Sequence, residues 1–143
     1  MTPNLQLVSG NLLLSRGGQP ETTDDWFELA SLGVRQVIKL NTDEEAADFV
    51  PPGVELFKCP ITTTEQVLTE PDEQSLVDAV GFIVGGTFVH CEHGQDRTGL
   101  VIAMHRVQNC GWQKQDAEAE MLEHGFHTLL FGLWRFWQDW RPS

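Results

Sequence analysis

Residues 87–107 read TFVHCEHGQDRTGLVIAMHRV, and this stretch decides the fold of the chain. Its opening, Thr87–Cys91, is a short run rich in apolar residues, as is typical of a buried strand. Apolar residues then recur at helical spacing and predict a helix over Arg97–Asn109. A loop between a strand end and a helix start can turn its N–H groups inward around a phosphate-sized anion. The sequence therefore predicts an anion cradle between these two elements.

The residue types in this loop suit covalent chemistry on phosphate. Cys91 starts the loop, and both a helix N-terminus and a neighbouring cation favour a thiolate there. Arg97 ends it, and a planar guanidinium can hold two phosphate oxygens at once. Gly94 lets the backbone approach a ligand closely, and Thr98 is expected to donate to the Cys91 sulfur. These features predict a cysteine-nucleophile phosphatase that forms a phosphocysteine and needs no metal or cofactor. The predicted phosphate-binding residues are Glu92, His93, Gly94, Gln95, Asp96 and Arg97.

The segment HCEHGQDRTG, residues 90–99, resembles the active-site loop of protein tyrosine and dual-specificity phosphatases. The resemblance extends over nearly the whole chain, and a compact bacterial-type member is the best match. It implies that Cys91 is the nucleophile and that Arg97 clamps the phosphate. Further segments that resemble this family are Leu14–Pro20, Leu32–Leu40, Gly111–Met121 and Gly125–His127.

The proton donor to the leaving group has several candidates in this sequence. The resemblance implies an aspartate in the loop after the third strand, but this chain has Thr62–Glu65 there. Asp96 is our first candidate, because some bacterial lipid-like and dual-specificity phosphatases share the Asp-Arg-Thr-Gly ending. Those enzymes usually carry a lysine where this chain has Gln95, so a preference for phosphoinositides is not carried over. Alternative acids are Glu65, Glu70 and Asp72.

Composition excludes several function classes. The 143 residues carry 21 acidic and 9 basic side chains, a net charge of −12, which argues against nucleic acid or an anionic membrane as a partner. No apolar stretch reaches the ~20 residues of a membrane span, and no secretory signal is recognisable. A thiolate enzyme requires a reducing compartment, so we expect a cytoplasmic protein. Cys59 is interpreted as a core cysteine, with a reversible disulfide to Cys91 as the alternative.

Alternation of strands and helices predicts an α/β fold. We expect one catalytic domain over residues 1–143, with three α/β/α layers around a mainly parallel sheet of four to five strands, as in protein tyrosine phosphatases. The strands are predicted at Leu12–Ser15, Val34–Asn41, Val54–Cys59 and Thr87–Cys91, with a threonine-rich loop after the third. The helices are predicted at Thr22–Ser31, Asp43–Phe49, Pro71–Val84, Arg97–Asn109, Gln113–Glu123 and Thr128–Trp140.

Trp134, Trp137 and Trp140 form an apolar stripe on the last helix. Such a stripe is usually core, with a dimer face or a substrate platform as the alternatives. His105, His124 and His127 are interpreted as helix residues without an identified partner. Their spacing does not predict a metal site.

Three functions remain open. The leading hypothesis is a phosphomonoester hydrolase of the protein tyrosine or dual-specificity type, acting on phosphotyrosine or phosphoserine/threonine, with a phosphoinositide or small-molecule phosphatase as an alternative. The second is a catalytically weak phosphate-binding module, because the Thr62–Thr64 segment lacks an aspartate. The third is sulfur transfer of the rhodanese kind, which the Arg97-Thr98-Gly99 pattern argues against.

Overall fold

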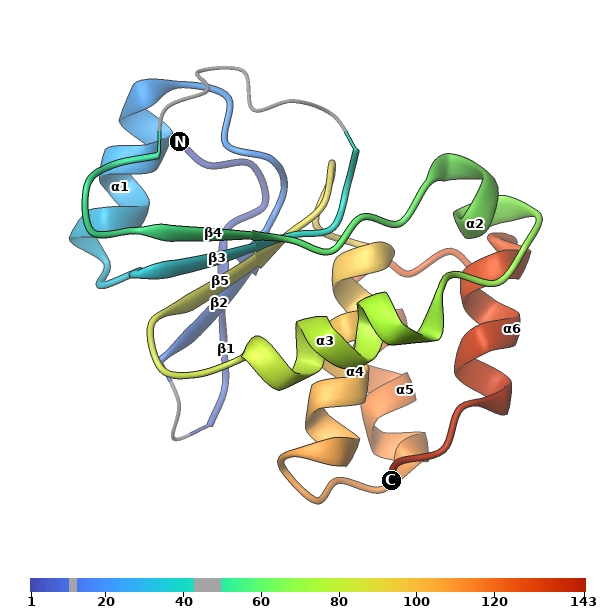
Figure 1. Cartoon of the computed structure of the whole chain (residues 1–143). Helices are drawn as coiled ribbons and strands as arrows, with labels where there is room; N and C mark the ends of the chain where they lie inside the picture. Colours follow the sequence, from blue (N-terminus) through green and yellow to red (C-terminus); the bar gives the residue numbers. More distant parts are fainter. Residues whose placement is uncertain (11–12, 43–49) are drawn as a thin grey trace.

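The computed structural model describes residues 1–10, 13–42 and 50–143, in which a five-stranded sheet carries helices on both faces (Figure 1). The strand order is β1-β2-β5-β3-β4, and every neighbouring pair is parallel except β1 and β2. The strands are β1 (Gln6–Val8), β2 (Leu14–Gly17), β3 (Gln36–Lys39), β4 (Glu55–Lys58) and β5 (Thr87–His90). The helices are α1 (Thr23–Ser31), α2 (Thr63–Val67), α3 (Glu73–Phe82), α4 (Arg97–Gln108), α5 (Lys114–Glu123) and α6 (Phe131–Asp139).

Successive side chains of the central strands enter two separate cores. Val37 and Phe88 point to one face of the sheet, where they pack with Trp26 and Leu29 of α1. Their neighbours Ile38 and Val89 lie in the larger core, which residues of α3, α4, α5 and α6 complete. Figure 1 shows α1 on one side of the sheet and α3 with α4 on the other. Burial on both faces explains why these parallel strands are apolar without alternation.

The three-layer α/β/α fold predicted from the sequence is confirmed. The ends of the elements differ by a few residues, and β2 lies two residues later than expected. Strand β1 was not predicted, since its Gln6–Val8 segment is short and lies at the edge of the sheet. The expected helix Asp43–Phe49 lies outside the described residues, as does the start of the strand expected from Leu12.

The prediction of a threonine-rich loop after the third strand is wrong, because Thr63–Val67 forms helix α2. The Thr62 hydroxyl accepts a hydrogen bond from the Glu65 N–H, and the Glu65 carboxylate accepts one from the Thr62 N–H. This reciprocal capping satisfies two of the free N–H groups at the helix start.

The tryptophan stripe is core, as predicted. Trp137 is fully buried and Trp140 is 7% exposed, while the half-buried Trp134 packs against Phe126. Because these side chains face the interior, the stripe gives no support to the dimer alternative. In the part of the chain that the structure describes, no helix is both long and apolar enough to cross a bilayer.

Candidate active site

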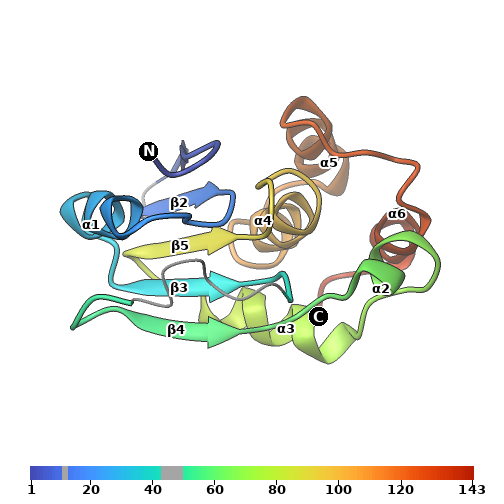
Figure 2. The ribbon, with the colours of Figure 1, turned by 90° about the horizontal axis from the view of Figure 1, so that it is seen from above.

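Residues 91–97, here called the phosphate loop, join the central strand β5 to α4, as Figure 2 shows from above. The carboxyl end of an inner strand is where open α/β sheets bind ligands. Cys91 is 3% exposed, and its Sγ accepts hydrogen bonds from the Gly94 N–H at 3.3 Å and the Thr98 hydroxyl at 3.0 Å. A backbone donor and a side-chain donor are therefore both directed at the sulfur.

Arg97 is fixed at one corner of the same loop. Its Nη1 donates to the carbonyl oxygen of Ile61 at 2.9 Å, just after the end of β4. Its Nε is buried and has no hydrogen-bond partner among the described residues. A buried N–H group without a partner is costly, so this side of the guanidinium is suited to an anionic oxygen.

The carbonyl groups of the phosphate loop contact groups outside the loop, three of which are donors from distant parts of the chain and one of which is the ring of the neighbouring His90. Four successive carbonyl oxygens have a partner within 3.2 Å. The pairs are Cys91 O with His90 Nδ1, Glu92 O with Gln19 N, His93 O with Asn4 Nδ2, and Gly94 O with Arg16 Nη2.

This outer set of hydrogen bonds orients the amides. In a trans peptide the carbonyl and the following N–H point to opposite sides of the chain. Because the carbonyls of residues 91–94 point outward, the N–H groups of residues 92–95 point inward. The N–H group of Gly94 illustrates this orientation, because it donates to the Cys91 sulfur inside the loop. The loop therefore has the converging amides that an oxyanion site requires.

Gly94 cannot be replaced without moving the loop. Its φ of +79° lies in the left-handed region, which residues with a Cβ rarely adopt. A Cβ at this position would also lie 2.4 Å from the carbonyl carbon of Gly17. Glycine thus allows the phosphate loop to pack directly on the end of β2.

Asp96 lies in the loop, but its carboxylate is turned toward His127. Oδ1 accepts a hydrogen bond from the His127 backbone N–H at 2.8 Å and lies 3.0 Å from the ring Nδ1. His127 is 61% exposed and belongs to the connection between α5 and α6. The interpretation of His127 as a helix residue is therefore wrong. Sequence reasoning missed its partner, because the contact joins residues 31 positions apart with no local pattern.

Of the alternative acids, Glu65 lies on α2, Asp72 is the N-cap residue of α3, and Glu70 lies between the two helices. Besides capping α2 through Oε1, Glu65 accepts the Asp72 N–H on Oε2 at 2.9 Å. Asp72 caps α3 by accepting from the backbone and the hydroxyl of Ser75. Both side chains thus have structural partners, whereas Glu70 is exposed and no contact distinguishes it.

A family model described as the DSP-PTPase phosphatase domain of Swiss Army Knife proteins matches residues 7–129. The chain belongs to this family. The match includes most of β1, all of β2 to β5, the whole phosphate loop and the Gly125–His127 segment.

Known proteins resemble this chain in a short stretch of sequence and in fold. Over 42 residues the chain is 50% identical to the dual specificity protein phosphatase TpbA of Pseudomonas aeruginosa, a match that covers 29% of this chain and only 19% of TpbA. The crystal structure of P. aeruginosa TpbA has a TM-score of 0.74 at 23% identity, over 96% of this chain and 90% of that chain. A TpbA variant in complex with pTyr has a TM-score of 0.71 at 22% identity, over 94% and 88%. The core catalytic domain of the PP-IP phosphatase SIW14 from S. cerevisiae has a TM-score of 0.72 at 17% identity, over 99% and 88%.

The other two cysteines of this phosphatase domain have different surroundings. Cys59 lies in the larger core, where burial raises the pKa of its thiol. Cys110 is exposed after the end of α4. Within residues 1–10, 13–42 and 50–143, no cluster of three or more His, Cys, Asp or Glu residues is placed to hold a metal ion.

Proposed function

We propose that this chain hydrolyses phosphomonoesters through a phosphocysteine on Cys91. The observation that carries the proposal is the arrangement around the Cys91 sulfur. It accepts two hydrogen bonds at the floor of a loop whose amides face inward, and the buried Arg97 side chain ends that loop. Membership of the phosphatase domain family supports the same chemistry.

The reaction divides into two displacements at phosphorus. In the first, the Cys91 sulfur forms a bond to phosphorus while the bond to the alcohol or phenol oxygen breaks. In the second, water attacks the phosphocysteine, inorganic phosphate forms and the thiolate leaves. Arg97 and the inward N–H groups of Glu92, His93, Gly94 and Gln95 stabilise the equatorial oxygens in both steps. The hydroxyl of Thr98 donates to the sulfur as it departs.

We assign the proton donor to Asp96, held in place by His127. It is the only one of our acidic candidates within the phosphate loop, and its contact with the ring Nδ1 links it to a second titratable group. Asp96→Asn should therefore impair an alkyl phosphate, whose leaving group must be protonated, about 100-fold more than p-nitrophenyl phosphate. Equal losses on the two substrates would remove Asp96 from this role, and Glu65→Gln and Asp72→Asn are the matched comparisons.

The substrate class we propose is a single phosphate on a protein side chain or a small molecule. The complex of a TpbA variant with pTyr supports phosphotyrosine as the substrate group. The net charge of −12 disfavours substrates with several phosphates, because an acidic surface repels polyanions. We further propose that residues 1–143 act as one catalytic domain in a reducing compartment, the cytoplasm.

The test is a steady-state assay with p-nitrophenyl phosphate, a phosphotyrosine peptide, a phosphoserine peptide and a phosphoinositide. Wild-type protein should turn over the first two, and Cys91→Ser should lose turnover while still binding vanadate. If wild type binds phosphate tightly without turnover, the chain is a phosphate-binding module and the proposal is wrong.

A further inference from the structure

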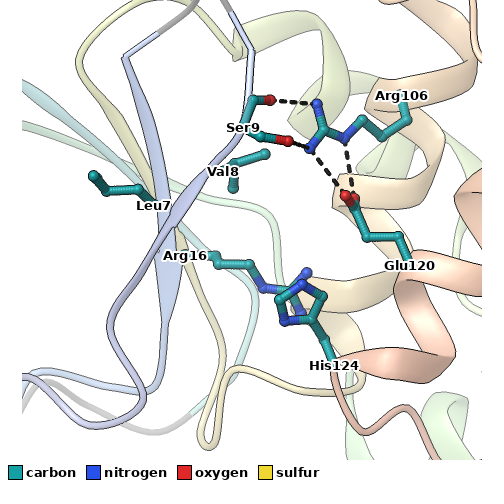
Figure 3. A pocket seen from close by; sticks show the side chains of 7 residues that line it. All are labelled: Leu7, Val8, Ser9, Arg16, Arg106, Glu120 and His124. Carbon is teal, nitrogen blue, oxygen red and sulfur yellow. Dashed lines mark hydrogen bonds and ion pairs between the residues drawn. The ribbon is translucent and has the colours of Figure 1, made fainter.

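Arg16 is a buried arginine behind the phosphate loop. It lies on β2 with an exposed fraction of 3%, and it lines a cavity of about 210 Å³ between β1, β2, α4 and α5. Figure 3 shows the side chains of Arg16 and His124, which line this cavity together with a second arginine, Arg106. Arg106 binds the Glu120 carboxylate through two nitrogens and also donates to Ser9.

The Arg16 side chain makes one hydrogen bond within the described part of the chain, from Nη2 to the Gly94 carbonyl at 3.1 Å. This contact fixes the peptide between Gly94 and Gln95. With its carbonyl pulled toward Arg16, the same peptide turns the Gln95 N–H to the inner side of the loop. Arg16 therefore acts on the ligand side of the loop without touching a ligand.

A hydrogen bond alone does not explain why this residue carries a charge. A neutral amide could donate to the same carbonyl, whereas burying a guanidinium costs more. Burial lowers the pKa of Arg16, and the negative groups Glu120 and Cys91 counteract this effect. Arg106 already binds both oxygens of Glu120. Arg16 and the Cys91 sulfur, in contrast, contact the same residue, because the Gly94 carbonyl accepts from Arg16 and the Gly94 N–H donates to the sulfur.

We infer that Arg16 is a positioning residue of this site, which holds the Gly94–Gln95 peptide with its N–H inward and places a buried positive charge behind Cys91. The orienting of the Gln95 N–H toward a phosphate rests on the proposed function. The effect of the Arg16 charge on the Cys91 sulfur does not. Sequence reasoning noted Arg16 as part of the Leu14–Pro20 resemblance but did not place it behind the loop, because its contact with the loop spans 78 residues.

The experiment compares substitutions of the two buried arginines in a Cys110→Ser background. Arg16→Met and Arg16→Gln remove the charge, and Arg16→Lys restores it. Arg106→Lys is the matched control, because Arg106 lines the same cavity but contacts Glu120 and Ser9 instead of the loop. Three quantities are measured: the thermal midpoint, the rate of Cys91 alkylation by iodoacetamide at neutral pH, and the affinity for vanadate.

In Arg16→Met and Arg16→Gln, Cys91 should be alkylated about 10-fold more slowly, because both variants lack the positive charge. Arg16→Met also loses the donor to the Gly94 carbonyl and should bind vanadate about 100-fold more weakly, the lower end of the effect of losing one oxyanion-site donor. Arg16→Lys should recover most of the alkylation rate. Arg106→Lys should lower only the thermal midpoint. A purely structural role for Arg16 predicts instead that its variants behave like Arg106→Lys, and that result would overturn the inference.

Alkylation and vanadate binding need no turnover, so they separate the two proposals. If wild type fails to hydrolyse p-nitrophenyl phosphate while Arg16→Met still slows alkylation, the proposed function is wrong and the role of Arg16 toward the sulfur stands. If wild type turns over and both neutral variants keep normal alkylation and vanadate affinity, the proposed function stands and the inference fails.

Discussion

Removing the Thr98 hydroxyl should separate the two steps of the reaction. Thr98 is fully buried and donates to the Cys91 sulfur at 3.0 Å, so Thr98→Val keeps the volume and deletes one donor. A hydrogen bond to a charged group contributes about 1.5–3 kcal/mol, and about 1.4 kcal/mol is a tenfold change in rate. The Gly94 N–H still serves the sulfur, which places the effect at the lower end. We therefore expect alkylation of Cys91 at neutral pH to slow about 10- to 30-fold.

The Thr98 hydroxyl also stabilises the sulfur when it leaves phosphorus, so hydrolysis of the phosphocysteine should be slower in Thr98→Val as well. Stopped-flow mixing with p-nitrophenyl phosphate should show a burst of p-nitrophenolate in Thr98→Val, because the phosphocysteine accumulates. Thr98→Ser keeps the hydroxyl and should resemble wild type. The reasoning is refuted if Thr98→Val alkylates at the wild-type rate and shows no burst.

Three further predictions concern the clamp, the loop conformation and a buried histidine. Arg97→Lys should lose about 100- to 1,000-fold in kcat/KM, because an ammonium group cannot contact both the Ile61 carbonyl and a phosphate oxygen as the fork does; near-normal kinetics would contradict this. Gly94→Ala should lower the free energy of unfolding in urea by about 1–3 kcal/mol, because Gly94 has a positive φ and a Cβ there would meet Gly17. Gly81→Ala in α3 is the control and should not be destabilising, because a Cβ there would contact no described atom within 4 Å. Burial and, to a lesser degree, Arg106 hold the pKa of His105 below its ordinary value of 6.5. The unfolded chain therefore binds a proton there more readily, and the free energy of unfolding should fall as the pH drops through 6.5 and level off below the folded-state pKa. His105→Gln should reduce the difference in this free energy between pH 7.5 and pH 5.5, and an unchanged difference would exclude the assignment.

The part of the site that lies in one segment could be anticipated from the sequence. Cys91, Gly94, Arg97 and Thr98 fall within eight residues, and the strand end and helix start that position them depend on local apolar patterns. Helix α2 also had a readable local signal, since Thr62 and Glu65 have the spacing of a capping box. The roles of these residues in catalysis remain predictions for the experiments above.

The hydrogen bonds that hold the phosphate loop in place could not be anticipated from the sequence, because their donors come from distant parts of the chain. Asn4, Arg16 and Gln19 hold three carbonyls of the loop across more than 70 positions, and no periodicity or motif spacing encodes such pairings. His127 reaches Asp96 in the same way from beyond α5. Only the folded structure shows that the N-terminal part of the chain also donates hydrogen bonds to the carbonyls of the phosphate loop.

The most direct test of the account is to identify the covalent intermediate. Wild-type protein mixed with a phosphomonoester substrate should be quenched in acid within milliseconds, digested, and analysed by mass spectrometry for a phosphate on the peptide that contains Cys91. The account predicts phosphate on the Cys91 sulfur, enriched in Thr98→Val and absent in Cys91→Ser. Turnover without any phosphate on Cys91, or turnover that persists in Cys91→Ser, would contradict it.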